Sequence, residues 1–70
     1  MTTGMELRLE RTAARVKLGV LAARIGRHPA TINRWEGAVV VDGERAAEYR
    51  RALASLAHDA GTATIDRAAA

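Results

Sequence analysis

The stretch Leu21-Ala-Ala-Arg-Ile-Gly-Arg-His-Pro-Ala-Thr-Ile-Asn-Arg-Trp-Glu-Gly37 contains two short helical patterns separated by a glycine. Leu21, Ala22 and Ile25 are spaced to share one face of a first helix, because side chains three or four residues apart lie on the same side. Ile32 and Trp35 have the same relation in a second helix. The stretch therefore predicts two consecutive helices, each with one apolar face.

The residues between the two patterns predict a tight corner. Gly26 follows the last turn of the first helix, where a glycine with positive φ commonly ends a helix. Pro29 suits the first position of the next helix, because its missing N–H would be unpaired there in any case. We therefore expect a short turn to join the two helices.

The spacing Leu-Ala-x-x-x-Gly-x-x-x-x-x-Ile-x-x-Trp-Glu is met in full at six positions, which are Leu21, Ala22, Gly26, Ile32, Trp35 and Glu36. This pattern resembles the helix-turn-helix of the Cro and lambda-repressor family. The resemblance is looser over residues 5–57, where the family has one helix before the motif and one or two after it. It implies an all-α domain of four to five helices in which the helix at about residues 29–35 enters the major groove of double-stranded DNA.

Length and composition exclude several other classes of protein. Seventy residues predict one small domain, and the absence of cysteine excludes a disulfide framework or a Cys-based zinc site. Two histidines thirty residues apart make a poor metal site. No apolar run approaches the roughly 18 residues of a membrane span, and no signal peptide is apparent. We expect a cytoplasmic protein with no cofactor, no metal, no small-molecule ligand and no membrane contact.

Positive charge is concentrated in the half that contains the motif. Residues 1–35 contain seven Lys and Arg against two Glu, whereas residues 36–70 contain four Arg against six acids. Clustered cations beside a recognition helix can neutralise DNA phosphates, although an ordinary solvated face has the same composition. The candidate phosphate contacts are Lys17, Arg24, Arg27, Thr31, Arg15 and Arg11. Thr31 could instead pack its methyl group inward.

The resemblance places five residues at base-facing positions of the recognition helix: Arg34, Asn33, Ala30, Pro29 and His28. Proline and alanine offer only apolar contact, for instance with a thymine methyl, so hydrogen-bonding readout falls mainly on Arg34. Two other interpretations stay open. Arg34 could bind a phosphate or pair with Glu36, and His28 could cap the helix.

The first helix is expected to begin at Thr3-Gly4-Met5-Glu6, which has the form of a capping box. An apolar stripe then predicts its buried face, formed by Met5, Leu9, Ala13 and Val16. Leu7 lies nearly opposite this stripe and is a candidate for an exposed apolar contact. The link at residues 15–20 does not define where the second helix begins, and it lacks the glutamine with which the family contacts a phosphate there.

After Gly37, three consecutive valines precede Asp42, which is a good N-cap for a helix at residues 44–58. The valines could fold into the core as a loop, or form an extended segment that pairs with a second subunit. Asp59-Ala60-Gly61 is expected to end the helix and the domain (residues 1–61), leaving residues 62–70 as a tail that is disordered or docked on a partner. The predicted dimer surface comprises Val39, Val40, Val41 and Ile65.

These patterns predict a sequence-specific, double-stranded DNA-binding transcription regulator, such as a Cro-type phage repressor. We expect a weak homodimer that tightens on its operator, because one short recognition helix reads only a few base pairs. An antitoxin, a recombination directionality factor, or a protein-interaction module that keeps the fold without DNA contact are the alternatives. An enzyme is not expected, because no paired nucleophile and base, glycine-rich phosphate loop or metal ligand set is present.

Overall fold

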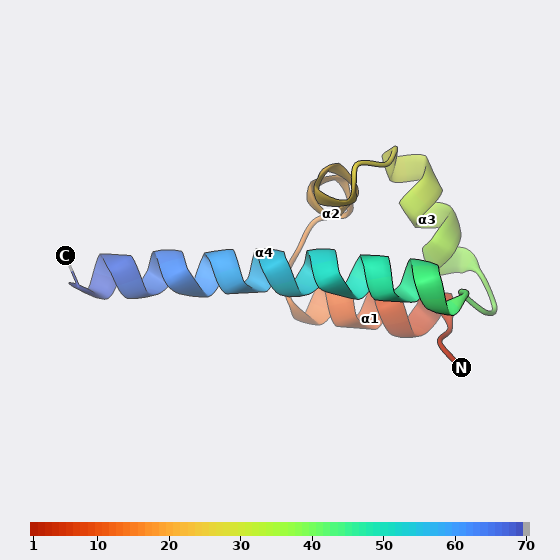
Figure 1. Cartoon of the computed structure of the whole chain (residues 1–70), viewed down its shortest axis with the longest axis horizontal. Helices are drawn as coiled ribbons and strands as arrows, with labels where there is room; N and C mark the ends of the chain where they lie inside the picture. The colour runs from red at the N-terminus through yellow and green to blue at the C-terminus, as the bar shows by residue number, and fades with distance from the viewer. Residues whose placement is uncertain (70) are drawn as a thin grey trace.

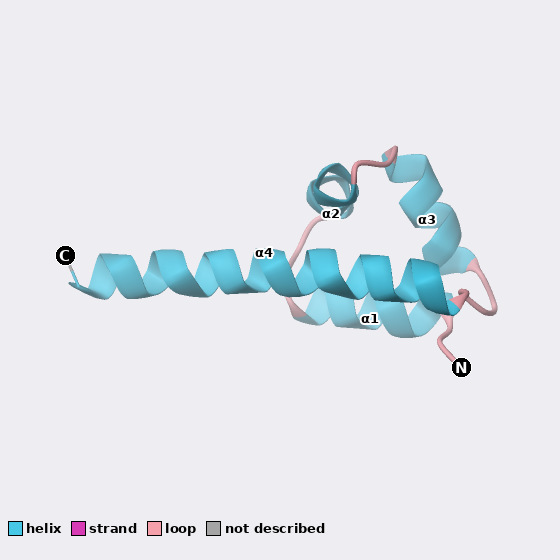
Figure 2. Ribbon diagram, viewed as in Figure 1, coloured by secondary structure: helices cyan, strands magenta, loops and turns pink. Residues whose placement is uncertain are grey.

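The computed structural model describes the backbone of residues 1–69 and the side chains of residues 1–59. This part of the chain contains four helices and no strand (Figures 1 and 2). They are α1 (Gly4–Ala13), α2 (Leu18–Ile25), α3 (Pro29–Gly37) and α4 (Gly43–Ala69). The predicted all-α class and the four helices are confirmed. None of the described helices is both long and apolar enough to cross a membrane.

Helices α1 and α2 each pack against α4, and α3 packs against both α1 and α2. Helix α1 lies alongside the first half of α4, while α2 and α3 lie on another side, with α3 also in contact with α1 (Figure 1). The last turns of α4 extend beyond the other three helices (Figure 1). The core is thus formed where the first half of α4 meets the three short helices.

Apolar side chains from all four helices form this core. Leu7, Leu21, Ile32 and Tyr49 are fully buried, and Trp35 is buried beside them. Burying an aliphatic or aromatic side chain of this size contributes about 1.5–3 kcal/mol each. The expected inward face of α2 and α3 is therefore confirmed, and it holds the two helices at a defined angle.

The turn between α2 and α3 is built as the sequence predicts. Gly26 has φ 85°, and its N–H donates to the carbonyl of Ala22 at 2.9 Å, which closes the end of α2. Helix α3 begins at Pro29, and the side chain of His28 caps it, since Nδ1 accepts the Ala30 N–H at 3.0 Å. Local signals alone determine both ends of this turn.

The start of α1 is also confirmed, because Thr3 Oγ1 accepts the Glu6 N–H at 3.1 Å. Its predicted buried face is wrong for Met5, Leu9 and Ala13, which are exposed, whereas Val16, just beyond the end of α1, is partly buried against the core. Leu7 is fully buried, whereas Met5 and Leu9 are 56% and 59% exposed. The true inward face contains Gly4, Leu7 and the partly buried Arg11, at the spacing i, i+3, i+7.

Gly4 allows this orientation, because it lies directly against the end of α3. A Cβ at this position would overlap the carbonyl oxygens of Trp35 and Glu36. The Gly4 N–H also donates to the carbonyl of Ala38 at 3.0 Å. Helix α1 can therefore approach α3 closely at this point only with glycine.

The loop after α3 divides the three valines between core and surface. Val41 is buried and pairs with Thr2 in an isolated bridge, in which the Val41 N–H donates to the Thr2 carbonyl at 2.8 Å. Val39 and Val40 stay exposed. Asp42 caps α4 as predicted, since Oδ1 accepts the Arg45 N–H at 2.9 Å.

Helix α4 does not end at residues 59–61 as expected, but continues to Ala69. A glycine ends a helix only where it adopts the left-handed conformation, and inside a helix it costs about 1 kcal/mol relative to alanine. The surrounding residues are rich in alanine, the best helix former, and contain no proline. The side chain of Ile65 lies outside the residues whose side chains are described.

Candidate nucleic-acid interface

The outer face of α3 carries four of the five candidate base-reading residues. Pro29, Ala30, Asn33 and Arg34 are all exposed, while Ile32 and Trp35 anchor the opposite face in the core. His28, at the N-cap, is exposed as well, although its Nδ1 is engaged by the Ala30 N–H. The five residues therefore form one continuous surface at the start and along the outside of α3.

Arg34 is the only long cationic side chain on this face of α3. It has no ion-pair partner among the residues whose side chains are described, and Glu36, a suggested partner, faces the protein interior. The suggested Arg34–Glu36 pair is therefore absent. An exposed guanidinium without an intramolecular carboxylate keeps all its donors for an external acceptor.

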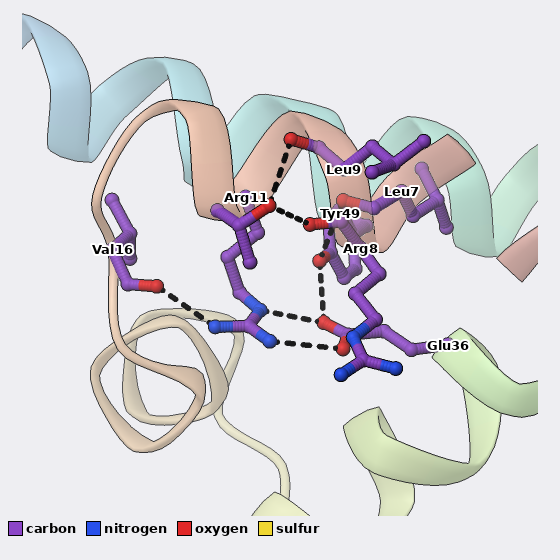
Figure 3. A network of polar contacts seen from close by, with 8 residues as sticks. Leu7, Arg8, Leu9, Arg11, Val16, Glu36 and Tyr49 are labelled. Atoms are coloured by element: carbon purple, nitrogen blue, oxygen red, sulfur yellow. Dashed lines mark hydrogen bonds and ion pairs between the residues drawn. The ribbon is translucent and has the colours of Figure 1, made fainter. Parts of the chain in front are cut away.

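Glu36 instead forms a buried network with residues of α1 and α4 (Figure 3). Arg11 Nε donates to Glu36 Oε2 at 2.7 Å, and Arg11 Nη2 donates to Oε1 at 3.1 Å, which makes the pair bidentate. Arg11 Nη1 donates to the carbonyl of Val16 at 2.9 Å, which ties the link before α2 to the same site. The hydrogen bonds to Glu36 raise the pKa of Arg11 above its ordinary value.

Arg11 is expected from the sequence to contact a phosphate, and the structure corrects this expectation. Its side chain is 13% exposed, and its guanidinium is held by Glu36 and Val16. Removing one partner of a buried ion pair typically costs about 3–5 kcal/mol, so Arg11 cannot turn outward without loss of stability. Its role is to join α1 to the end of α3.

Tyr49 completes the network from α4. Its hydroxyl oxygen lies 2.6 Å from Glu36 Oε2 and 3.0 Å from the carbonyl oxygen of Leu7 (Figure 3). The single hydroxyl proton is best donated to the charged carboxylate. Burial is the largest cause that raises the pKa of Tyr49, followed by the hydrogen bond to Glu36 and its negative charge. This network was not anticipated from the sequence, because its members are 13 and 25 residues apart.

Two other candidate phosphate contacts already have intramolecular partners. Arg24 donates to Ser55 Oγ at 2.6 Å and to Asp59 Oδ2 at 2.9 Å, and this directs its guanidinium toward α4. Arg27 lies 3.7 Å from a carboxylate oxygen of Glu48 and stacks over the Trp35 ring at 5.6 Å. Both side chains are still 41–50% exposed, so solvent and salt weaken these pairs.

Two exposed cations near the start of α2, Arg15 and Lys17, form no ion pair with a described carboxylate. Lys17 is the N-cap, is exposed, and forms no side-chain capping bond, so backbone N–H groups of the first turn face solvent without a side-chain acceptor. Arg15 is exposed too, and has the left-handed φ of 59° that allows the chain to turn between α1 and α2. Thr31, on α3, is half-buried, which leaves both interpretations of its side chain open.

The expected dimer residues fall in different environments. Val39 and Val40 are 85% and 48% exposed, whereas Val41 is 5% exposed and belongs to the core. The prediction that Val41 belongs to the dimer surface is therefore wrong, because its side chain is already buried within one chain. Ile65 lies outside the described side chains.

Comparison of this chain with protein-family models, with curated proteins and with solved structures finds no match.

Proposed function

We propose that this protein is a sequence-specific, double-stranded DNA-binding transcription regulator of the Cro type, with α3 as its recognition helix. The observation that carries the proposal is the two-sided character of α3. One face is fixed in the core by Ile32, Trp35 and Glu36, and the other presents Ala30, Asn33 and other short or polar side chains to solvent. A helix is about 10–12 Å wide with its side chains, and the major groove is about 12 Å wide.

Small residues at the tip of α3 would allow close approach to the bases. Pro29 and Ala30 carry no long side chain, so the start of the helix can enter the groove and make apolar contact with a thymine methyl. Asn33 can form paired hydrogen bonds with adenine, and Arg34 with guanine O6 and N7. Readout would then pass from apolar contact at the tip to hydrogen bonding one turn further along.

Phosphate contacts would orient this helix without reading sequence. Lys17 and the free N–H groups at the start of α2 suit one backbone phosphate, since a helix N-terminus attracts anions. Arg15 and Arg27 are exposed cations on either side of α2 in the sequence. The buried network of Glu36 supports this role indirectly, because it holds α3 rigidly against α1 and α4.

Selection of bound duplexes from a random pool tests the proposal directly. We expect enrichment of a short motif that contains at least one guanine, with bound duplexes at least about a thousandfold preferred over random DNA. The purified full chain and a mobility-shift assay at moderate salt then measure the preference. Failure to enrich any motif, together with no duplex binding at low salt, would reject DNA binding and leave a protein-interaction module as the function.

A further inference from the structure

A pocket of about 460 Å³ lies where the end of α3, the loop after it and the start of α4 meet. Its apolar wall is formed by Trp35, Ala38, Val40 and Val41. Small-molecule sites in proteins have volumes of about 300–1,000 Å³, mostly apolar walls and a few polar groups. This α3–α4 pocket therefore has the size and the apolar lining of such a site.

The charged residues of the α3–α4 pocket are Arg34, Asp42 and Arg45, and they leave one cation without a partner. Arg45 Nη1 donates to Asp42 Oδ2 at 2.8 Å, so these two opposite charges offset each other. Arg34 forms no ion pair with a described carboxylate. An occupant with a single negative charge would therefore match the pocket.

The apolar wall indicates the rest of the occupant. Trp35 and Val41 belong to the core, so this part of the wall is already fixed. Val40 is exposed and Ala38 is half-buried, so both still contact water. An apolar group in the pocket would remove them from water, which is favourable. The matching occupant thus has an apolar body beside its negative charge.

We infer that the α3–α4 pocket binds a small organic carboxylate with an apolar body, and that Arg34 holds the carboxylate. A guanidinium can bind a carboxylate through two parallel hydrogen bonds. Another pocket, between α2 and α4, is lined by Arg24, but that side chain already donates to Ser55 and Asp59. The sequence predicts no small-molecule ligand, because the α3–α4 pocket forms only where separate elements meet.

The DNA backbone competes for the same positive charges. Arg34 and Arg45 both line the pocket, and each could contact a phosphate, so charge alone does not distinguish the two occupants. The apolar wall does distinguish them. A phosphate has no apolar part to cover Val40 and Ala38, whereas the body of an apolar carboxylate covers both.

The consequence of ligand binding for DNA rests on the proposed function. Arg34 is also the proposed guanine contact, and one guanidinium cannot hold a carboxylate and a base at the same time. The ligand should therefore lower the affinity for the preferred sequence. It should leave random DNA bound as before, because Arg15, Lys17 and Arg27 remain free to contact phosphates.

Amide NMR titration of the isotope-labelled full chain, at constant ionic strength, tests the inference. Cyclohexanecarboxylate should shift the resonances of Ala38, Val40 and Asp42 with a Kd of roughly 1–10 mM, as expected for so small a ligand. Cyclohexylmethanol and cyclohexylmethylammonium keep the ring without the negative charge, and dimethyl phosphate keeps the charge without the ring. Each of these three probes should bind at least about fivefold more weakly.

Arg34→Gln removes the charge and keeps a polar side chain. This variant should bind cyclohexanecarboxylate no more tightly than cyclohexylmethanol. Arg51→Gln is the matched control, because Arg51 is an exposed arginine on α4 that does not line the pocket. It should bind the carboxylate like the wild type, and the amide spectra should show that both variants keep the fold.

Any of three results would overturn the inference. The first is the absence of shifts at these residues up to about 30 mM cyclohexanecarboxylate. The second is equally tight binding of the alcohol or of dimethyl phosphate, and equal binding of dimethyl phosphate would assign the pocket to the DNA backbone. The third is unchanged affinity for the carboxylate in Arg34→Gln.

The titration contains no DNA, so its result does not depend on the proposed function. Carboxylate binding by a chain that binds no duplex would uphold the site and reject the DNA-binding function. Duplex binding without carboxylate binding would do the reverse. Equal affinity for the preferred duplex with and without saturating carboxylate would reject the competition at Arg34.

Discussion

Arg34 is the residue whose loss should affect base choice rather than general affinity. Replacing Arg34 with alanine removes the guanidinium from the outer face of α3, where no described carboxylate holds it. We expect binding to the preferred sequence to weaken by about 1–3 kcal/mol, with relaxed base choice at one position. Fluorescence anisotropy with the selected duplex and with single-base variants measures both effects.

Lys17→Ala is the matched control, because Lys17 lies at the start of α2 beside the proposed phosphate contact. This variant should weaken preferred and random duplexes by the same factor. If Arg34→Ala also weakens both equally, Arg34 contacts a phosphate, and specificity must come from another residue or from DNA shape.

Tyr49 makes folding stability sensitive to alkaline pH. Burial first, and then the hydrogen bond to Glu36 and its negative charge, raise the pKa of Tyr49 above its ordinary value of 10.0. The folded state then holds the proton more tightly than the unfolded state. The contribution is complete below pH 10.0 and is lost as the pH rises further, at up to about 1.4 kcal/mol per pH unit. Urea unfolding between about pH 8 and pH 11 measures this loss.

Tyr49→Phe provides the comparison, since it removes the titrating hydroxyl and keeps the ring. At neutral pH this variant should be less stable by about 1–3 kcal/mol, because Glu36 loses a buried hydrogen bond. Its stability should fall less steeply than that of the wild type above pH 10.0. Identical alkaline slopes for the two chains would show that Tyr49 titrates normally in the folded protein.

The contact between the start of α1 and the end of α3 depends on the absence of one side chain. Gly4→Ala places a Cβ against the carbonyl oxygens of Trp35 and Glu36, which are backbone atoms and cannot rotate away. Because the helices must separate to make room, we expect a loss of about 2 kcal/mol or more in the free energy of unfolding. Chemical denaturation followed by circular dichroism measures it.

Gly19→Ala is the control for this prediction, because Gly19 lies in α2 and a Cβ there meets no atom within 4 Å. Alanine at this position should be neutral or stabilise the protein by up to about 1 kcal/mol. A Gly4→Ala variant as stable as Gly19→Ala would mean that α1 does not approach α3 as closely as described.

The ends of the helices could be predicted from the sequence, whereas the face of α1 that contacts α3 could not. The caps of α1, α3 and α4 and the end of α2 follow from signals within three or four residues, and all are confirmed. The buried face of α1 could not be predicted by apolar periodicity. Its inward residues include Gly4, which is small, and Arg11, which is charged, and each is explained only by a partner in α3.

Long-range partners also limited the prediction of the candidate site. The residues on the outer face of α3 could be named from the motif, because their exposure follows from the position of Ile32 and Trp35 on the other face. The sequence motif could not show which cations are paired within the protein and which are free to contact a phosphate. Arg11 and Arg24 have acidic partners 25 and 35 residues away, and no local pattern distinguishes them from free cations such as Lys17.

At the level of the whole molecule, intramolecular pairs reduce the positive charge that DNA can use. Arg11, Arg24, Arg45 and Arg50 each pair with a carboxylate at 2.7–2.9 Å. The cations best placed beside α2 and α3 are Arg15, Lys17, Arg27 and Arg34. The effective charge on the proposed DNA-binding face is therefore smaller than the sequence total indicates.

The dependence of DNA affinity on salt concentration measures the effective charge of the proposed DNA-binding face. Arg15, Lys17 and Arg27 offer three phosphate contacts, which predict a slope of log affinity against log salt of about −3 for each bound chain. Titrations of one duplex over a range of salt concentrations by anisotropy give the slope. A value near zero would argue against phosphate contact, and a value steeper than about −5 would show that internally paired arginines also open to bind DNA.

Trp35 gives the protein an optical property of its own. It is the only tryptophan in the chain, and the guanidinium groups of Arg27 and Arg45 lie 5.6 Å and 5.9 Å from its ring centroid. The indole excited state responds to nearby charge, so its emission registers the departure of either arginine from the ring. Fluorescence can therefore follow events at the end of α3 in real time, with no label attached.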